Sequence, residues 1–121
     1  MDRTYKYFEV EGHGPTCVVR LLPMRYDESL LDPMGAELAQ LLDVEGFRNI
    51  VLSLGPDDPD CLQSVFLAKL LNLKKRLELG GGVLLLTDLS EHTRHILQVV
   101  GLEKHFRSCE TVEAALKSLA S

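Results

Sequence analysis

The chain has 121 residues, 45% of them hydrophobic, and a formal net charge of −5, which is the size and composition of one globular domain. The acidic balance argues against a broad basic surface for nucleic acid, and no apolar run is long enough to span a bilayer. The N-terminus is too polar for a signal peptide, and three cysteines without CxxC spacing predict free thiols in a reducing compartment. We therefore expect one domain over residues 1–121, located in the cytoplasm.

The first third of the chain predicts a β-hairpin followed by a helix. Polar and apolar residues alternate over 5–11, and an apolar, β-branched run covers 16–22; both patterns are typical of strands. The short turn between them makes the pair antiparallel. Asp32-Pro33 is typical of a helix start, and Gly46 is a plausible stop for that helix.

The middle of the chain predicts a buried strand over 49–54 and then a long helix that runs to Gly80. One face of that helix carries an apolar stripe that should pack on the sheet, formed by Leu62, Phe66, Leu70, Leu73 and Leu77. Two prolines and a glycine over 55–60 exclude regular structure between them. A strand that turns into a helix N-terminus presents unpaired backbone N–H groups, which favour an anion or a phosphorylated hydroxyl. Ser64 lies in the first turn of this helix and is the residue on which the functional interpretation centres.

The last third predicts an apolar strand over 83–87 and then a helix with Ser90 as N-cap, Gly101 just past its end, and Ile96, Leu97 and Val100 on its inner face. A short strand over 106–108 and a final helix capped by Thr111 follow. The element order is β-β-α-β-α-β-α-β-α. It predicts an α/β fold in which a mixed sheet opens with an antiparallel hairpin, continues in β-α units and carries four helices.

This order of elements resembles the STAS domain, the family of anti-sigma factor antagonists and of the cytoplasmic domains of sulfate transporters. The resemblance covers nearly the whole chain. The segments that carry it are Tyr7-Phe8-Glu9-Val10 with Val18-Val19-Arg20-Leu21, Ile50-Val51-Leu52-Ser53-Leu54, Leu67-Ala68-Lys69-Leu70-Leu71, Gly81-Gly82-Val83-Leu84-Leu85-Leu86, and Gly101-Leu102-Glu103-Lys104-His105-Phe106.

In that family an Asp-Ser-Ser-Gly motif opens the central helix, and its second serine accepts phosphate from a partner kinase. Counting back from Leu67 places the motif on residues 62–65 and Ser64 at the phosphoacceptor position. The other three positions depart from the motif: Leu62 replaces the aspartate, Gln63 the first serine and Val65 the glycine. The loss of the aspartate removes a group expected to position the hydroxyl.

The resemblance implies a non-enzymatic regulatory module that binds an anti-sigma factor, a kinase of the GHKL type, without a cofactor or a metal. Ser64 is then the candidate phosphoacceptor, and a charge on it would switch the affinity for the partner. The candidate partner-binding residues surround it: Asp57, Asp58, Asp60, Leu62, Gln63 and Val65. The sequence leaves the oligomeric state open.

Other interpretations remain beside this one. The domain can be a constitutive scaffold without a phospho-switch, or a small-molecule or lipid-binding module with a cleft lined by Val65, Leu67 and Leu71. The loop with Asp57, Asp58 and Asp60 is better explained as a solvated segment that complements the positive N-terminal dipole of the following helix than as a cation site. The spacing of its aspartates matches no calcium-binding loop. Cys61 lacks a histidine base at any motif spacing, and His92 with His95 lacks a third metal ligand.

Overall fold

The computed structural model describes residues 2–22, 29, 31–55 and 64–120, with the backbone alone at 2–4 and 64–65. The strands are β1 (Asp2–Thr4), β2 (Phe8–His13), β3 (Thr16–Leu21), β4 (Asn49–Ser53), β5 (Leu84–Thr87) and β6 (Arg107–Cys109). The helices are α1 (Leu31–Asp43), α2 (Ser64–Leu79), α3 (Glu91–Val99), the short 3₁₀ turn η2 (Glu103–His105) and α4 (Val112–Ala120). No helix in the described part of the chain is long and apolar enough to cross a membrane.

The six strands form one mixed sheet in the order β1-β2-β3-β4-β5-β6. The first three strands pair antiparallel, and β3 to β6 pair parallel, with Arg20 opposite Ser53 and Ser53 opposite Thr87. The parallel part is connected by helices, as crossovers between parallel strands require. The predicted fold class, a mixed sheet with an N-terminal antiparallel hairpin and four helices, is confirmed.

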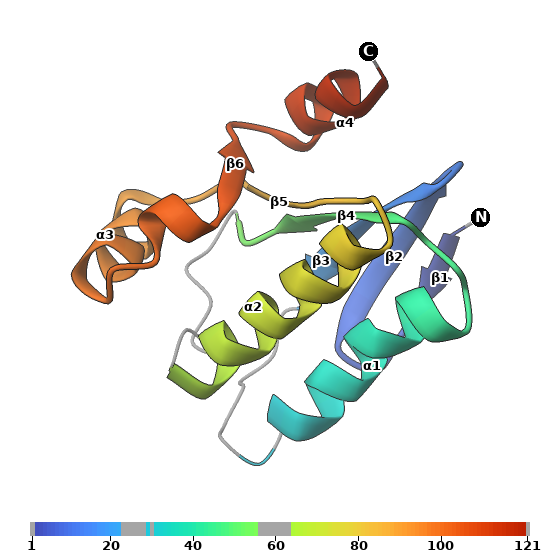
Figure 1. Cartoon of the computed structure of the whole chain (residues 1–121), viewed down its shortest axis with the longest axis horizontal. Coiled ribbons are helices and arrows are strands. Elements are labelled where there is room, and N and C mark those ends of the chain that lie inside the picture. The colour runs from blue at the N-terminus through green and yellow to red at the C-terminus, as the bar shows by residue number, and fades with distance from the viewer. Residues whose placement is uncertain (1, 23–28, 30, 56–63, 121) are drawn as a thin grey trace.

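The helices are divided unequally between the two faces of the sheet. Figure 1 shows α1 and α2 side by side below the sheet and α4 above it. The main core lies between the sheet and α1, α2 and α3. A smaller core lies under α4, where Ala115 packs on Val18, Val51 and Leu85. One face is therefore covered by three helices and the other by a single nine-residue helix.

The alternation of side chains along the strands explains this division. On β4, Ile50 and Leu52 point into the main core, and Val51 points into the smaller one. All three are fully buried, as the continuous apolar run predicts for a strand covered on both faces. The predicted stripe on α2 is confirmed as a core face where the structure describes its side chains. Its buried members are Phe66, Leu70, Leu73 and Leu77.

Some boundaries differ from the sequence-based expectations. The strand predicted over 5–11 is divided: Tyr5 and Lys6 lie in the connection between β1 and β2, and the second strand runs on to His13. Helix α1 begins at Leu31, so Asp32 lies in its first turn rather than at the cap. Val100, expected on the inner face of α3, is 47% exposed because that helix has already ended at Val99.

Glu37 of α1 holds the connection between β1 and β2 against the helix layer. Its carboxylate accepts the backbone N–H of Lys6 at 2.8 Å and that of Tyr7 at 3.0 Å. Hydrogen bonds to a charged acceptor are stronger than neutral ones. Glu37 therefore fixes the connection between the first two strands onto a helix 30 residues away in sequence.

We expect Glu37→Ala to lower the free energy of unfolding by about 1.5 kcal/mol, because two backbone donors lose a charged acceptor. Glu37→Gln keeps one acceptor oxygen and should lower the free energy of unfolding by about half as much. Urea denaturation followed by circular dichroism measures both. The control is Glu78→Ala, which removes only the exposed i,i+4 pair with Lys74 and should cost less than about 0.5 kcal/mol. Equal losses for Glu37→Ala and Glu78→Ala would contradict the proposed anchor.

Candidate functional site

The candidate site is the corner of the sheet where β4 and β5 end, from which the chain continues to α2. Because β4 and β5 are parallel neighbours, their carboxyl ends meet at one edge, with Ser53 opposite Thr87. Ser64 is the first residue of α2, the 16-residue helix that follows β4 in the chain. The structure thus places the predicted phosphoacceptor at a helix N-terminus, where backbone N–H groups lack intrahelical partners.

Asp88 organises the described part of this corner. Its carboxylate oxygen Oδ2 accepts the hydroxyl of Ser53 at 2.8 Å and the hydroxyl of Thr87 at 2.7 Å. Its backbone N–H donates to the carbonyl of Glu110 at 3.2 Å. Ser53 and Thr87 are buried, so these bonds satisfy hydroxyls that water does not reach freely. One carboxylate therefore ties together the ends of β4 and β5.

Asp88 holds a backbone conformation that few residues adopt. Its φ is +58°, and it is the one non-glycine residue with positive φ in the described part of the chain. Aspartate tolerates this left-handed region better than most residues, because its short polar side chain makes local hydrogen bonds. The turn after β5 thus keeps a strained residue that is stabilised by the hydroxyls it contacts.

Gly55, the last described residue before the helix, packs against the same aspartate. A Cβ atom at Gly55 would lie 2.7 Å from the Asp88 carbonyl oxygen and 2.8 Å from the Asp88 Cβ. No real side chain fits at such distances without a shift of the backbone. The chain leaving β4 therefore passes directly over the turn after β5.

Most of the predicted partner-binding residues lie outside the described residues, namely Asp57, Asp58, Asp60, Leu62 and Gln63. Cys61 lies outside them as well. Val65 lies in the first turn of α2 with Ser64. Their role in binding a partner stays a prediction.

The other candidates from the sequence serve packing or lie on the surface. Leu67 is buried and Leu71 packs on the main core, so both belong to the contact between α2 and the sheet. His92 and His95 are exposed on α3, and no three metal-binding side chains come together in the described ranges. Cys17 is a free, buried thiol whose pKa is raised to about 12 by desolvation, so it is protonated and unreactive at neutral pH.

Asp88 is the residue of this corner that the sequence analysis missed. The available signal was its place, directly after a buried parallel strand adjacent to β4. Polar residues at the carboxyl ends of parallel strands often lie in a binding site. The hydroxyl of Ser53 lies 35 residues away in the sequence, so no local motif joins the two residues.

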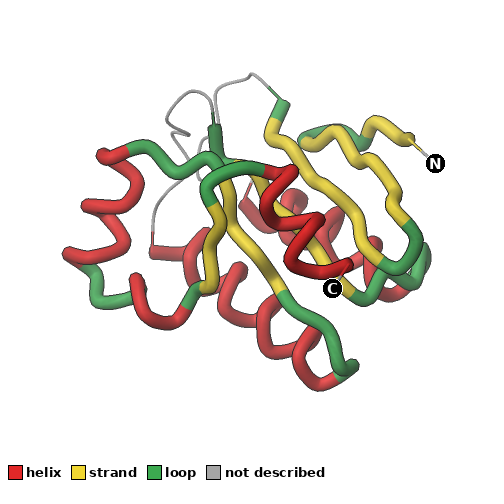
Figure 2. The backbone as a smooth tube through the Cα atoms, turned by 90° about the horizontal axis from the view of Figure 1, so that it is seen from above, coloured by secondary structure: helices red, strands yellow, loops and turns green. Residues whose placement is uncertain are grey.

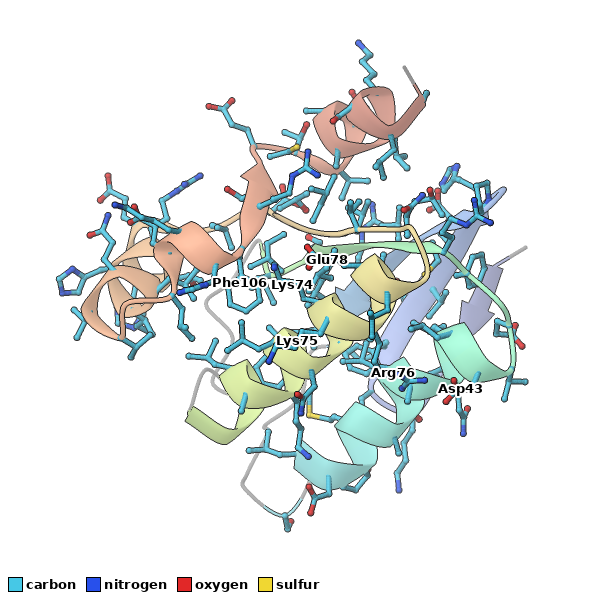
Figure 3. All side chains as sticks on the ribbon, in the orientation of Figure 1. Asp43, Lys74, Lys75, Arg76, Glu78 and Phe106 are labelled. Carbon is cyan, nitrogen blue, oxygen red and sulfur yellow. The ribbon has the colours of Figure 1, made fainter. Side chains whose placement is uncertain are left out.

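The basic residues of α2 are engaged mainly with acidic residues nearby. Arg76 pairs with Asp43 and Lys69 pairs with Asp32, both on α1, and Lys74 pairs with Glu78 on α2 itself. Figure 3 shows Arg76 and Asp43 facing each other across the two helices. These basic residues therefore lie on an outer surface that ion pairs connect to α1, and this surface is separate from the corner at Asp88.

Several solved structures of anti-sigma factor antagonists have the same architecture. An anti-sigma factor antagonist (STAS) domain protein from Planctomyces limnophilus has a TM-score of 0.76 at 19% identity, over 94% of this chain and 98% of the other. An anti-sigma factor antagonist from Mycobacterium paratuberculosis has a TM-score of 0.75 at 20% identity, over 94% and 93%. The phosphorylated form of SpoIIAA, a cell fate determinant from Bacillus, has a TM-score of 0.67 at 20% identity, over 93% and 98%.

No protein-family model matches the chain, and no curated protein matches its sequence. The structural similarity nevertheless extends over nearly the full length of both partners in each comparison. The chain therefore has the STAS fold, the fold of anti-sigma factor antagonists. The resemblance seen in the sequence is confirmed at the level of the fold.

Proposed function

We propose that this domain is a non-enzymatic regulatory module of the anti-sigma factor antagonist type, which binds a protein partner at the corner between β4 and α2. The partner is an anti-sigma factor of the GHKL kinase class, and Ser64 is the candidate phosphoacceptor. The observation that carries this proposal is the position of Ser64 as the first residue of α2, after the carboxyl end of β4. The fold shared with anti-sigma factor antagonists supports it.

The chemistry of the corner suits a switch. A phosphate at a helix N-terminus interacts favourably with the helix dipole, so modification of Ser64 does not oppose folding of α2. The added charge changes the surface that a partner contacts at the start of α2. Repulsion between the phosphate and acidic groups of the partner's nucleotide site would then release the partner.

We expect Ser64→Asp to weaken binding of the kinase-type partner by about tenfold or more, because it places a permanent negative charge at the contact. The partner is first identified by pull-down from the source cells with the wild-type chain, and its affinity is then measured by calorimetry. The matched control is Asn72→Asp, which adds the same charge to an exposed position two turns along α2.

The outcomes separate a switch from a constitutive scaffold. Loss of affinity in Ser64→Asp but not in Asn72→Asp supports the switch, and intact-mass analysis of the native protein then reports whether Ser64 carries phosphate. Equal affinity of all three proteins for a kinase-type partner favours the scaffold, which the replacements at Leu62, Gln63 and Val65 also favour. Failure to recover any such partner contradicts the proposed function.

A further inference from the structure

The face of the sheet that carries α4 has a groove beside that helix. The groove is open to solvent and has a volume of about 720 Å³, which is within the range of binding sites. Its floor consists of the outward-facing side chains of β2 and β3, and one wall is α4. Among the lining residues are Glu11, His13 and Arg20 from the floor and Val112, Glu113 and Leu116 from the wall.

The groove exists because α4 covers only half of its face. This helix contacts β4, β5 and β6, and Figure 2, seen from the α4 side, shows no helix in front of the strands near the N-terminus. Neighbouring strands lie about 4.8 Å apart, so β3 and β2 lie roughly 10 and 14 Å from β5, the middle strand of the three that α4 contacts. Packed helices lie about 8 to 10 Å apart, so a second helix beside α4 would be centred near β3.

The wall and the floor have opposite characters. Val112 and Leu116 are one helical turn apart on α4, and both are only partly buried, so they offer an apolar edge to the groove. The floor is acidic. Glu11 pairs with Arg20 at 3.6 Å and also with His13, so these two basic side chains leave little positive charge to neutralise the other carboxylates of the groove.

Further carboxylates surround that floor. Glu9 lies on the same face of β2 as Glu11, Glu113 projects from α4, and Asp88 closes one end of the groove. Arg20 is the only lysine or arginine among the described residues that line it. An occupant with basic side chains would therefore be attracted over the strands, and its apolar side chains would meet α4.

We propose that this groove binds a basic amphipathic helix of a partner protein, which packs alongside α4 and lies over β2 and β3. Leucine-like side chains of that helix contact Val112 and Leu116, and its lysines or arginines face Glu9, Glu11 and Glu113. The groove meets the corner between β4 and α2 at Ser53, Gly55 and Asp88, and its other lining residues lie on β2, β3 and α4 or just before α4. This inference goes beyond the proposed function and does not depend on it.

The test uses a defined probe and the complete folded chain. The probe is an acetylated, amidated 14-residue peptide of leucine and lysine with its leucines on one helical face, and its leucine–glutamate counterpart is the comparison. Amide chemical shifts of the ¹⁵N-labelled protein locate the site, and their titration gives the affinity. We expect the lysine peptide to shift amides of β2, β3 and α4, and the glutamate peptide to leave them unchanged.

Two variants with the same change of charge distinguish binding in the groove from general attraction of a basic peptide to an acidic protein. Glu113→Lys lies on the wall of the groove, whereas Glu103→Lys lies on the exposed turn η2. We expect Glu113→Lys to lower the affinity for the lysine peptide by about fivefold or more, and Glu103→Lys to lower it by less than about twofold. Ser64→Asp should leave this affinity unchanged.

Three results would overturn the inference. The first is a set of shifts spread over α1 and α2 instead of the groove. The second is an equal loss of affinity in Glu113→Lys and Glu103→Lys, which would indicate attraction by net charge alone. The third is concentration-dependent dimerisation in sedimentation experiments that Glu113→Lys abolishes, because the occupant would then be a second copy of this chain.

Discussion

Gly82→Ala is expected to lower the free energy of unfolding by at least about 3 kcal/mol. A Cβ atom at this position would lie 1.8 Å from the carbonyl oxygen of Arg48 and 2.7 Å from its carbonyl carbon. Both atoms belong to the backbone, so no side-chain rotation can make room. The only relief is to separate the turn before β5 from the start of β4.

That separation is costly because the two segments are held together from both sides. The Gly82 N–H donates to the carbonyl of Leu77 at 2.8 Å, which anchors the turn to the end of α2. On the other side, the Asn49 side chain accepts the N–H of Val83 at 3.0 Å and donates to the hydroxyl of Thr16 at 3.1 Å. A methyl group at Gly82 would strain these bonds as well as the contact itself.

Gly80→Ala is the control, and thermal and urea unfolding measure both variants. A Cβ atom at Gly80 meets its nearest neighbour at 3.6 Å, an ordinary contact, and its φ is not positive. We expect this variant to change stability by less than about 0.5 kcal/mol. Similar stability of the two alanine variants would show that the contact at Gly82 does not constrain the fold.

Asp88→Ala is expected to cost about 2 to 3 kcal/mol of stability and to weaken partner binding at the corner. The substitution removes the acceptor of two hydroxyls, those of the buried Ser53 and Thr87, and leaves an alanine at positive φ. Unsatisfied buried hydroxyls cost about 1 to 3 kcal/mol each, and the left-handed conformation adds about 1 kcal/mol for alanine. Solvent at the partly exposed Asp88 offsets part of this sum.

Asp88→Asn distinguishes the role of shape from the role of charge. Asparagine tolerates positive φ, and its carbonyl oxygen can accept both hydroxyls, so we expect a stability loss of less than about 1 kcal/mol. If Asp88 only shapes the corner, Asp88→Asn binds the partner like the wild type. If its charge is part of the contact surface, this variant alters affinity while it keeps stability. An Asp88→Ala variant as stable as the wild type would contradict the structural role.

The order of elements and the core were predictable because they depend on local patterns. The apolar run at 49–54 and the stripe from Phe66 to Leu77 fix a buried strand and a helix that packs on it, and both lie as expected. The three-residue strand β1 was missed because its pairing with β2 depends on a register that a short polar segment does not reveal. Whether so short a segment forms a strand depends more on its pairing with the neighbouring strand than on its own β-propensity.

The candidate site was predictable only in part. The position of Ser64 at a helix start follows from the breakers before it and from the apolar spacing after it. The role of Asp88 depends on the pairing of β4 with β5 and on a backbone conformation at a single residue. The groove depends on how far α4 reaches across the sheet, which is a property of packing that periodicity does not contain.

The uninterrupted strand order has a consequence for how this protein is made. Each strand pairs with the one synthesised just before it, so the sheet can grow by addition at one edge while the ribosome is still translating. Helix α4 follows all six strands in the chain, and Val18, Val51 and Leu85 stay uncovered until that helix emerges from the ribosome. Nascent chains that lack the final nine-residue helix should therefore be the species that chaperones retain.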